Sequence, residues 1–202
     1  MGLWLDGSSL VLASGSAIRR ALLEAAGIPV EPIPPGLDER AVEAQAGRAA
    51  PSAVAALLAR EKARKVAAAC RQRVVLGADQ ILVLNGRRLT KPRDRAGARE
   101  QLRALRGDTH ELHSAAALVR DGAVLFETAD HARLTMRNFS AAFLESYLDA
   151  AGEAVTVSVG GYQVEGPGIQ LFERIEGDHF GILGLPLLPL LAFFRREGWL
   201  AG

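Results

Sequence analysis

The amino-acid sequence predicts an α/β fold with a mixed, twisted sheet and flanking helices, arranged as two lobes around a cleft. Short apolar strands alternate with helical segments along the chain, from Leu10–Ala13 to a last helix that begins at Pro186. Glycine-rich stretches, Gly160-Gly161 and Gly166-Pro167-Gly168, interrupt this pattern, and we expect them to line the cleft. With 202 residues, 49% of them hydrophobic, the chain can bury a substantial core without disulfides.

The first half of the chain combines two strand–helix alternations with one proline-rich loop. The expected elements are a strand at Leu10–Ala13, a helix at Ala17–Ala26, a strand at Val30–Ile33, a long alanine-rich helix capped by Ser52 and reaching Cys70, and a strand at Arg73–Ala78 that ends at Asp79. Between the second strand and the long helix, Pro34-Pro35-Gly36 opens a loop that carries Leu37-Asp38-Glu39.

The second half is expected to contain more strand. Its elements are a hairpin at Ile81–Leu89 around Asn85-Gly86, a helix capped by Asp94 and reaching about Leu105, strands at Glu111–Val119 and Ala123–Met136 joined at Asp121-Gly122, a helix at Ser140–Ala150, a strand at Ile169–Glu173 and a helix from Pro186 to about Gly198. Asn-Gly suits a type I′ turn because both residues tolerate positive φ.

Charge and composition exclude several classes of partner. The formal net charge is +1, from 24 basic and 23 acidic residues, so no global field would gather a nucleic acid polymer or an anionic membrane. Cys70 is the single cysteine, which rules out an internal disulfide. The N-terminus lacks the basic start of a signal peptide, and the apolar run Ile182–Phe194 is too short for a membrane helix. We therefore expect a cytoplasmic protein.

Ser14-Gly15-Ser16 precedes a helix whose first turn carries Arg19 and Arg20. Free backbone N–H groups, hydroxyl donors and guanidinium groups together suit a phosphate. The alternative is that Ser16 only caps the helix and the arginines are solvated. The loop does not match the P-loop pattern, which disfavours P-loop phosphate transfer.

Two carboxylate positions are candidates for chemistry. Asp79 follows an apolar strand, where open α/β sheets place their ligands, so it is a candidate base or metal ligand; the alternative is a turn or cap aspartate. Asp38-Glu39 offers further oxygens for a hard divalent cation, although adjacent loop acids are commonly just solvated.

Two lysines stand out for different reasons. Lys62 lies in a run of charged residues, and its pattern favours a salt-bridged, solvated helix face. Lys91 precedes Pro92, which restricts its backbone to extended conformations. The histidines do not have the spacing of a zinc site, and no G-x-S-x-G elbow is present for a serine hydrolase.

Taken in order, a set of segments spanning nearly the whole chain resembles the Maf family of nucleoside triphosphate pyrophosphatases. The segments are Leu12-Ala13-Ser14-Gly15-Ser16 with Arg19-Arg20, Leu37-Asp38-Glu39, Arg60-Glu61-Lys62-Ala63, Leu76-Gly77-Ala78-Asp79-Gln80, Lys91-Pro92, Gly168-Ile169-Gln170-Leu171-Phe172-Glu173-Arg174-Ile175-Glu176-Gly177 and Gly184-Leu185-Pro186-Leu187. Their common order and spacing are far more specific than any one of them.

The resemblance implies one Maf-like domain over residues 1–202 with an inosine-triphosphatase-like fold, a divalent cation (Mg²⁺ or Mn²⁺) and a homodimer. It implies cleavage between the α and β phosphates of a nucleoside triphosphate. By resemblance, Asp79 is the proton acceptor and a metal ligand, and Glu39 takes part in metal binding or catalysis. Arg19, Lys62 and Lys91 would bind phosphates, with Ser14 and Ser16 also at the substrate.

The family resemblance also bears on the base. Gln80 after Asp79, and Glu165 before Gly166, resemble the branch that acts on 7-methyl-GTP rather than on dTTP and UTP. A carboxylate can accept both N1–H and the N2 amino group of guanine, and its charge favours a cationic methylated ring; alternatively, Glu165 is an exposed loop acid.

Three positions depart from the family pattern. Ile18 stands where the 7-methyl-GTP branch tends to have Trp and the other branch Arg, Ala17 replaces the usual Pro, and Thr90 replaces a Gly.

The function expected from the resemblance is metal-dependent pyrophosphohydrolysis of 7-methyl-GTP. The alternatives are dTTP/UTP hydrolysis, an inosine-triphosphate-type activity, and a non-catalytic nucleotide-binding regulator of septum formation.

Overall fold

A computed structural model describes residues 2–202, which form two compact units. Unit 1 contains residues 2–80, 114–130 and 178–202, and unit 2 contains Ile81–His113 and His131–Gly177. The division falls within three long strands. That the whole chain forms one domain stays a prediction.

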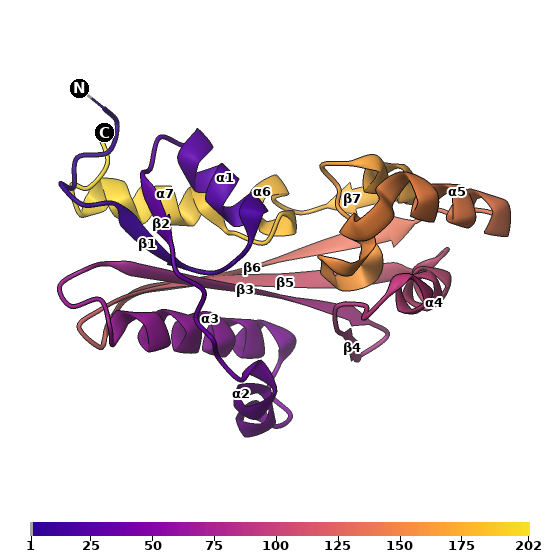
Figure 1. The fold of residues 1–202 in the computed structure, drawn as a ribbon, viewed down its shortest axis with the longest axis horizontal. Coiled ribbons are helices and arrows are strands. Elements are labelled where there is room, and N and C mark those ends of the chain that lie inside the picture. The colour runs from indigo at the N-terminus through magenta and orange to yellow at the C-terminus, as the bar shows by residue number, and fades with distance from the viewer. Residues whose placement is uncertain (1) are drawn as a thin grey trace. The chain divides into compact units, whose positions relative to one another are not determined.

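The structure confirms the α/β class (Figure 1). The strands are β1 (Leu10–Ala13), β2 (Val30–Pro32), β3 (Val75–Leu84), β4 (Arg87–Leu89), β5 (Thr109–Arg120), β6 (Ala123–Met136) and β7 (Phe172–Glu176). The α-helices are α1 (Ala17–Ala25), α2 (Glu39–Ala46), α3 (Pro51–Ala67), α4 (Arg95–Leu105), α5 (Ala141–Ala151), α6 (His179–Ile182) and α7 (Leu187–Arg196). Three 3₁₀ helices are η1 (Gly152–Thr156), η2 (Val159–Gly161) and η3 (Pro167–Leu171).

The sheet is mixed, as expected. Its order is β2-β1-β3-β5-β6-β7, with β4 paired to β3. β1 is parallel to both β2 and β3, whereas the β3–β4 and β6–β7 pairs are antiparallel. Both expected two-residue turns have positive φ at each residue: Asn85-Gly86 and Asp121-Gly122. Within residues 2–202, no helix is long and apolar enough to cross a membrane.

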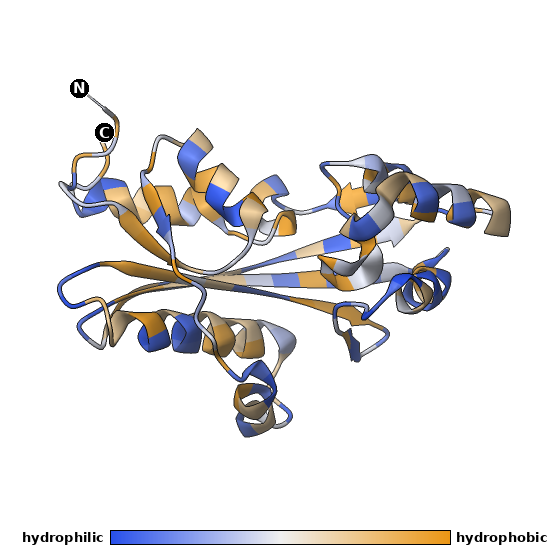
Figure 2. Ribbon diagram, viewed as in Figure 1, coloured by the Kyte–Doolittle hydropathy of each residue, from blue (hydrophilic) through white to orange (hydrophobic). Residues whose placement is uncertain are grey.

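In unit 1, β1 is buried on both faces because helices cover each side. Leu10 and Leu12 belong to a cluster that includes Phe194 of α7, and Val11 lies with Val66 of α3 in another cluster. Figure 1 shows α1 and α7 on one side of these strands and α3 on the other. The run of hydrophobic residues in β1, orange in Figure 2, is typical of a parallel strand buried on both faces.

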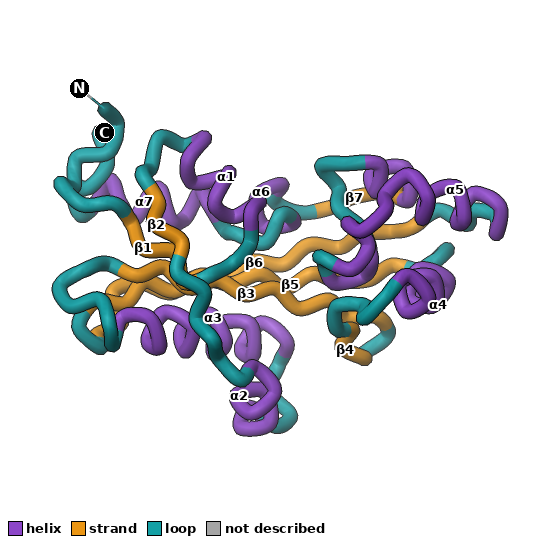
Figure 3. Tube along the Cα trace, in the orientation of Figure 1, coloured by secondary structure: helices purple, strands orange, loops and turns teal. Residues whose placement is uncertain are grey.

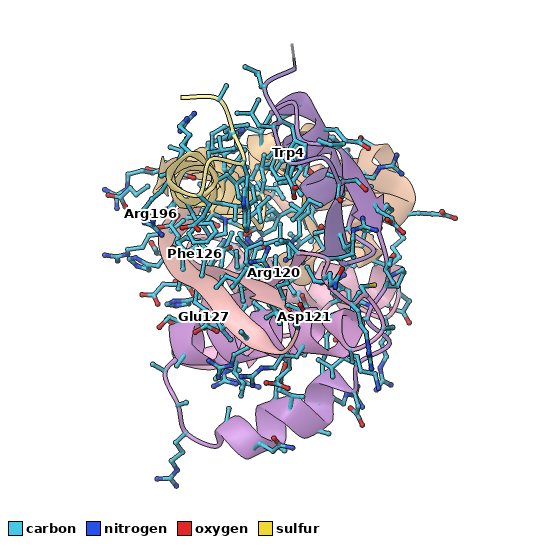
Figure 4. All side chains as sticks on the ribbon, turned by 90° about the vertical axis from the view of Figure 1, so that its left-hand side faces the viewer. Trp4, Arg120, Asp121, Phe126, Glu127 and Arg196 are labelled. Atoms are coloured by element: carbon cyan, nitrogen blue, oxygen red, sulfur yellow. The ribbon has the colours of Figure 1, made fainter. Side chains whose placement is uncertain are left out.

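Aromatic side chains join the end of α7 to the rest of unit 1. Trp4 packs edge-on against Phe194 with ring centroids 5.3 Å apart, and its indole N–H donates to the Ser8 carbonyl at 2.8 Å. Phe126 of β6 lies 4.8 Å from Phe193, centroid to centroid. Figure 4 labels Trp4 and Phe126 among the side chains at this end.

Unit 2 is held by polar contacts as well as by apolar packing. The Asp94 side chain caps α4, as predicted, and Arg99 of that helix makes two bonds, of 2.6 and 2.7 Å, to Glu145 of α5. His110 is fully buried, and its Nε2 lies 2.6 Å from the Tyr162 hydroxyl. Burial lowers the pKa of His110 to about 4.

Several expected boundaries were wrong. Ser52 is not the cap of α3, because Pro51 already occupies the first turn, where its missing N–H costs nothing. The expected strand at Ile169–Glu173 begins only at Phe172, after the 3₁₀ helix η3. The short helix α6 was missed.

The segment carrying Leu37-Asp38-Glu39 also differs from the expected loop. Only its first part is loop, the stretch after β2 that is teal in Figure 3. Asp38 accepts a hydrogen bond from the Ala41 N–H at 3.1 Å and so caps α2, whose first residue is Glu39. The cap fixes where the Glu39 backbone lies.

Asp79 does not end its strand. β3 continues for five residues beyond it, so the expected strand and the first arm of the hairpin are one element. However, β1 pairs with β3 only as far as Ala13 and Gly77. Asp79 therefore lies just past the end of β1, where the chain leaves the sheet through Ser14.

Candidate functional site

A glycine lets α3 approach β3 closely. A Cβ on Gly77 would overlap the Ala59 carbonyl oxygen and lie 2.8 Å from the Ala63 nitrogen. A real Cβ cannot occupy either place, so only glycine permits this contact between helix and strand. Because side chains alternate along a strand, Asp79 lies on the same face as Gly77 and is turned towards α3.

Lys62 of α3 meets Asp79 in a buried ion pair. Its Nζ lies 2.5 Å from Asp79 Oδ1 and 2.8 Å from Glu39 Oε1. The side chains of Lys62 and Asp79 are each 9% exposed, whereas that of Glu39 is 50% exposed. The predicted solvated role of Lys62 is thus wrong: it lies in the apolar stripe of α3, and Glu61 pairs with Arg64 instead.

Burial is the largest influence on the pKa of Asp79. It raises the pKa of Asp79 above its usual value, while the nearby charges of Lys62 and Arg19 oppose the rise. Burial likewise lowers the pKa of Arg19, which the carboxylates of Asp79 and Glu39 counteract. The site therefore gathers two cations and two carboxylates that nearly balance in charge.

Arg19 is held beside the loop that leaves β1. Its Nη1 donates to the Ala78 carbonyl at 2.8 Å and lies 3.4 Å from Ser14 Oγ, and its Nε donates to the Gly184 carbonyl at 2.8 Å. Ser14 Oγ also accepts from the Ser16 N–H at 3.2 Å. Ser14, Ser16 and Arg19 therefore lie close together, and their role at a phosphate stays a prediction.

Ser16 also caps helix α1, as the simpler interpretation expects. Its hydroxyl accepts from the Arg19 N–H at 3.4 Å. Ile18, in the first turn of α1, is half-buried.

Gln80 follows Asp79 but uses its amide elsewhere. Its Nε2 lies 3.0 Å from Ser114 Oγ, 3.1 Å from the Gly181 carbonyl and 2.9 Å from the Ile182 carbonyl. An amide nitrogen has two hydrogens, so these three acceptors use its full donor capacity.

Lys91 and Glu165 belong to unit 2. Both side chains are exposed, Lys91 in the segment between β4 and α4 and Glu165 between η2 and η3. The structure brings six of the ten predicted site residues together in unit 1: Ser14, Ser16, Arg19, Glu39, Lys62 and Asp79. Ile18 and Gln80 belong to the same unit, but the Gln80 amide bonds to other partners.

A divalent cation would find few protein ligands here. Over residues 2–202, no group of three or more His, Cys, Asp or Glu side chains is arranged to hold a metal ion. Glu39 and Asp79 nevertheless converge on one point, the Lys62 ammonium. Two carboxylates fit Mg²⁺, which commonly takes one or two carboxylates and completes its shell with water and substrate phosphates.

Sequence reasoning missed the residues that support the site. Ser114, only 2% exposed, and the carbonyls of Gly181 and Gly184 contribute hydrogen bonds, and Gly77 provides the close approach of α3. A lysine in the apolar stripe of a helix is the one signal that could have identified the buried pair, since lysine is almost never buried unless paired.

The family model and the sequence relatives match almost the whole chain. A family model described as "Maf-like protein" matches residues 9–197. A "Nucleoside triphosphate pyrophosphatase" of Nitrobacter winogradskyi is 54% identical over 99% of this chain and 98% of its own. A "7-methyl-GTP pyrophosphatase" of Rhizobium etli is 51% identical over 96% of this chain and 98% of its own. A solved HAM1 protein from Coxiella burnetii covers 65% of this chain and 74% of its own, with 16% identity and a TM-score of 0.39.

Proposed function

The chain belongs to the Maf-like protein family and is a nucleoside triphosphate pyrophosphatase, and we propose that Asp79 is its general base and 7-methyl-GTP its preferred substrate. The observation that carries the proposal for the reaction is the buried Lys62–Asp79 pair with Glu39 on the same ammonium. A buried carboxylate with a raised pKa and adjacent cations is typical of a catalytic site.

The proposed reaction is attack of water on the α phosphorus. Asp79 accepts the proton of the attacking water, a P–O bond forms, and the bond from the α phosphorus to the bridging oxygen breaks to release pyrophosphate. Burial favours this role because it raises the proton affinity of the carboxylate. Lys62, Arg19 and Lys91 are the cations assigned to the phosphates, whose charge grows on the leaving oxygens.

Ser14 and Ser16 precede the N-terminus of α1, where unpaired N–H groups favour an anion. We assign both residues to the same phosphates. The hydroxyl oxygen of Ser16 accepts from the Arg19 N–H, which leaves its own O–H able to donate to a phosphate oxygen.

A divalent cation is part of the proposal. Glu39 and Asp79 would hold Mg²⁺ or Mn²⁺, and the ion would neutralise phosphate charge and lower the pKa of a bound water. The Lys62 ammonium keeps the two carboxylates together without the ion, because it binds both.

The choice of 7-methyl-GTP rests on three observations. A relative at 51% identity carries that name, Gln80 matches the same branch, and Glu165 is exposed and therefore accessible to a base. Ile18 matches neither the Trp of the 7-methyl-GTP branch nor the Arg of the dTTP/UTP branch, so this position does not separate the two, and dTTP and UTP are the competing substrates. Ile18 offers only apolar contact to the base.

Two further expectations remain proposals: a homodimer and a cytoplasmic location. A nucleotide-binding regulator of septum formation without turnover is the second candidate function. The buried Lys62–Asp79 pair argues against it, because a protein that only binds needs no base.

The first experiment measures pyrophosphate release from purified protein with Mg²⁺ and Mn²⁺ in turn. Asp79→Asn should lower kcat about 10²- to 10⁴-fold, the usual contribution of a general base. Asp149→Asn, on the exposed face of α5, is the matched control and should keep wild-type turnover. Wild-type kcat in Asp79→Asn would remove the role assigned to that residue, and no pyrophosphate from the wild type would favour the regulator.

The second experiment compares 7-methyl-GTP, GTP, dTTP and UTP. The wild type should have its highest kcat/KM on 7-methyl-GTP. Glu165→Gln should reduce that preference about 10-fold, because an amide cannot accept both guanine hydrogen bonds and carries no charge. Equal or better kcat/KM of the wild type on dTTP would overturn the substrate assignment.

A further inference from the structure

The segment that carries Glu165 lies between η2 and η3 of unit 2. Its residues 163–166, which we call the Glu165 loop, belong to no helix or strand, and Glu165 itself is exposed. The residue before the loop is different, because Tyr162 is only 5% exposed. The loop therefore starts at a buried aromatic side chain, which the proposed reaction does not use.

Two hydrogen bonds hold the chain at this point. The Tyr162 hydroxyl oxygen lies 2.6 Å from Nε2 of His110, a fully buried residue of β5. The Tyr147 hydroxyl, from α5, donates to the Gly161 carbonyl at 2.9 Å. We call the side chains of His110, Tyr147 and Tyr162 the loop anchor. Because they come from three separate parts of unit 2, the anchor ties the start of the Glu165 loop to both β5 and α5.

Glycines allow close packing at both ends of the loop. A Cβ on Gly160 would lie 2.7 Å from Leu82 Cδ1 and 2.7 Å from Tyr162 Cε1, which is closer than a real Cβ can approach. At the other end, a Cβ on Gly168 would overlap the Gln163 carbonyl oxygen. The two ends are thus packed without spare space, so a shift of Tyr162 moves the loop that follows it.

The only hydrogen bond of the His110 side chain is the one to Tyr162. Among the residues that the structure describes, none bonds to Nδ1 of this histidine. Burial lowers the pKa of His110 to about 4 and raises that of Tyr162, so the two side chains pair as neutral groups at pH 7. An apolar side chain would fill the same space without leaving a polar atom unpaired. The bond to Tyr162 is therefore what the histidine adds.

Ring packing alone would place Tyr162 less narrowly. Its ring meets Phe172 edge-on with centroids 4.9 Å apart, and such contacts tolerate a wide range of centroid distances. A hydrogen bond is more restrictive, because it weakens when its length or angle departs from a narrow range. The anchor thus sets how deeply Tyr162 enters the core, and with it the place of the Glu165 loop.

We propose that His110, Tyr147 and Tyr162 are positioning residues, which hold the Glu165 loop so that the Glu165 carboxylate meets the guanine edge of the substrate. The inference rests on the proposed role of Glu165 in base recognition. The anchor touches neither the base nor the phosphates and acts through Glu165. Its loss should therefore weaken the binding of 7-methyl-GTP and leave the chemical step unchanged.

Two variants test the anchor. Tyr162→Phe removes one hydroxyl and keeps the ring that packs against Phe172. Tyr147→Phe removes the donor to the Gly161 carbonyl. Each variant is made in the wild-type chain and in the Glu165→Gln chain, so that an effect transmitted through Glu165 can be separated from any other.

Thr109→Val is the matched control. It also removes a part-buried hydroxyl contact of unit 2, since Thr109 Oγ1 lies 2.9 Å from Thr135 Oγ1. Residues 109 and 110 are turned to opposite faces of β5, so the control does not touch the anchor. Steady-state kinetics are measured on 7-methyl-GTP and dTTP, and amide hydrogen exchange is followed in residues 160–168 of the substrate-free protein.

In Tyr162→Phe, KM for 7-methyl-GTP should rise about 5-fold, the effect of weakening one hydrogen bond at the base, while kcat and the KM for dTTP stay within about twofold. In the Glu165→Gln chain the same change should raise KM by less than about twofold, because the group through which the anchor acts is altered. Exchange in residues 160–168 should accelerate. Tyr147→Phe should show the same pattern and Thr109→Val none of it.

A purely structural role makes a different prediction. It lowers stability in all three hydroxyl variants and gives kinetic effects that do not depend on Glu165. An equal rise of KM for 7-methyl-GTP with and without the Glu165 carboxylate would therefore overturn the inference. So would unchanged KM, or a fall of kcat on both nucleotides with KM unchanged.

Two complications leave the test decisive. If Tyr162→Phe does not fold, Tyr147→Phe carries the same comparison. If the wild type does not prefer 7-methyl-GTP, the substrate assignment fails, and hydrogen exchange alone decides whether the anchor holds the loop. Faster exchange in residues 160–168 of the tyrosine variants supports the anchor, and exchange as slow as in wild type overturns it.

Discussion

Replacing Lys62 with methionine tests the central ion pair directly. The Lys62→Met variant keeps an unbranched side chain of similar length and removes only the ammonium group. Asp79 then loses a partner at 2.5 Å in a place where its side chain is 9% exposed, and Glu39 loses a partner at 2.8 Å but can hydrate, because it is half-exposed. The cost should therefore come almost entirely from Asp79.

The geometry sets the size of the effect. Two unit charges 2.5 Å apart attract by about 7 kcal/mol at an effective dielectric constant of about 20, which is an upper bound because burying the ammonium opposes it. Breaking a buried pair by removing one partner typically costs about 3–5 kcal/mol. We expect a loss of that size in the free energy of unfolding at pH 8.

The loss should depend on pH. An acid whose folded pKa is raised contributes stability that is present below its unfolded pKa and lost as the pH rises through the folded value. Burial raises the pKa of Asp79, and Lys62 is the largest influence opposing that rise, so its removal raises the pKa further. The difference between Lys62→Met and wild type should therefore be smaller at pH 4 than at pH 8.

Urea unfolding, followed by tryptophan fluorescence at pH 4 and pH 8, measures both quantities. Lys65→Met, on the exposed side of the same helix, is the control and should change stability by less than about 0.5 kcal/mol. Adding Asp79→Asn to Lys62→Met should recover about 2 kcal/mol or more of the summed losses. Equal stability of the two lysine variants at pH 8 would refute the reasoning.

Two further predictions concern residues that support the fold. Gly77→Ala should destabilise the protein by about 3 kcal/mol or more and lower kcat, because the new Cβ overlaps the Ala59 carbonyl. The control Gly7→Ala has open space around its Cβ and should change neither stability nor kcat. A stable, active Gly77→Ala variant would show that α3 can move away from β3. Burial lowers the pKa of His110 to about 4, below its unfolded value of about 6.5. Neutral His110 therefore contributes about 3 kcal/mol to the free energy of unfolding above pH 6.5, and this contribution is lost as the pH falls through 4. Urea unfolding of His110→Gln between pH 7 and pH 4 should show a flatter dependence than wild type or the exposed-site control His131→Gln, and a dependence as steep as wild type would contradict the assignment.

Local patterns in the sequence predicted much of the fold correctly. The hairpin at Asn85-Gly86 and the caps Ser16 and Asp94 depend on a few neighbouring residues, and all three are confirmed. Predictions failed where a partner outside the segment decides the outcome. Asp79 was expected at a strand end because an acid commonly interrupts an apolar run, yet pairing with other strands carries β3 through it.

The sequence by itself determined the α/β class, the order of the motifs and the types of residue available for chemistry on a triphosphate. Only the tertiary structure decided which of them share a site and which of them are buried or paired. It buried Lys62 against Asp79, although the charge pattern favoured a solvated lysine, because Gly77 lets the helix lie directly on the strand. It also used the amide of Gln80 within the protein. Close approach and burial depend on residues far apart in the chain, so no local pattern could predict them.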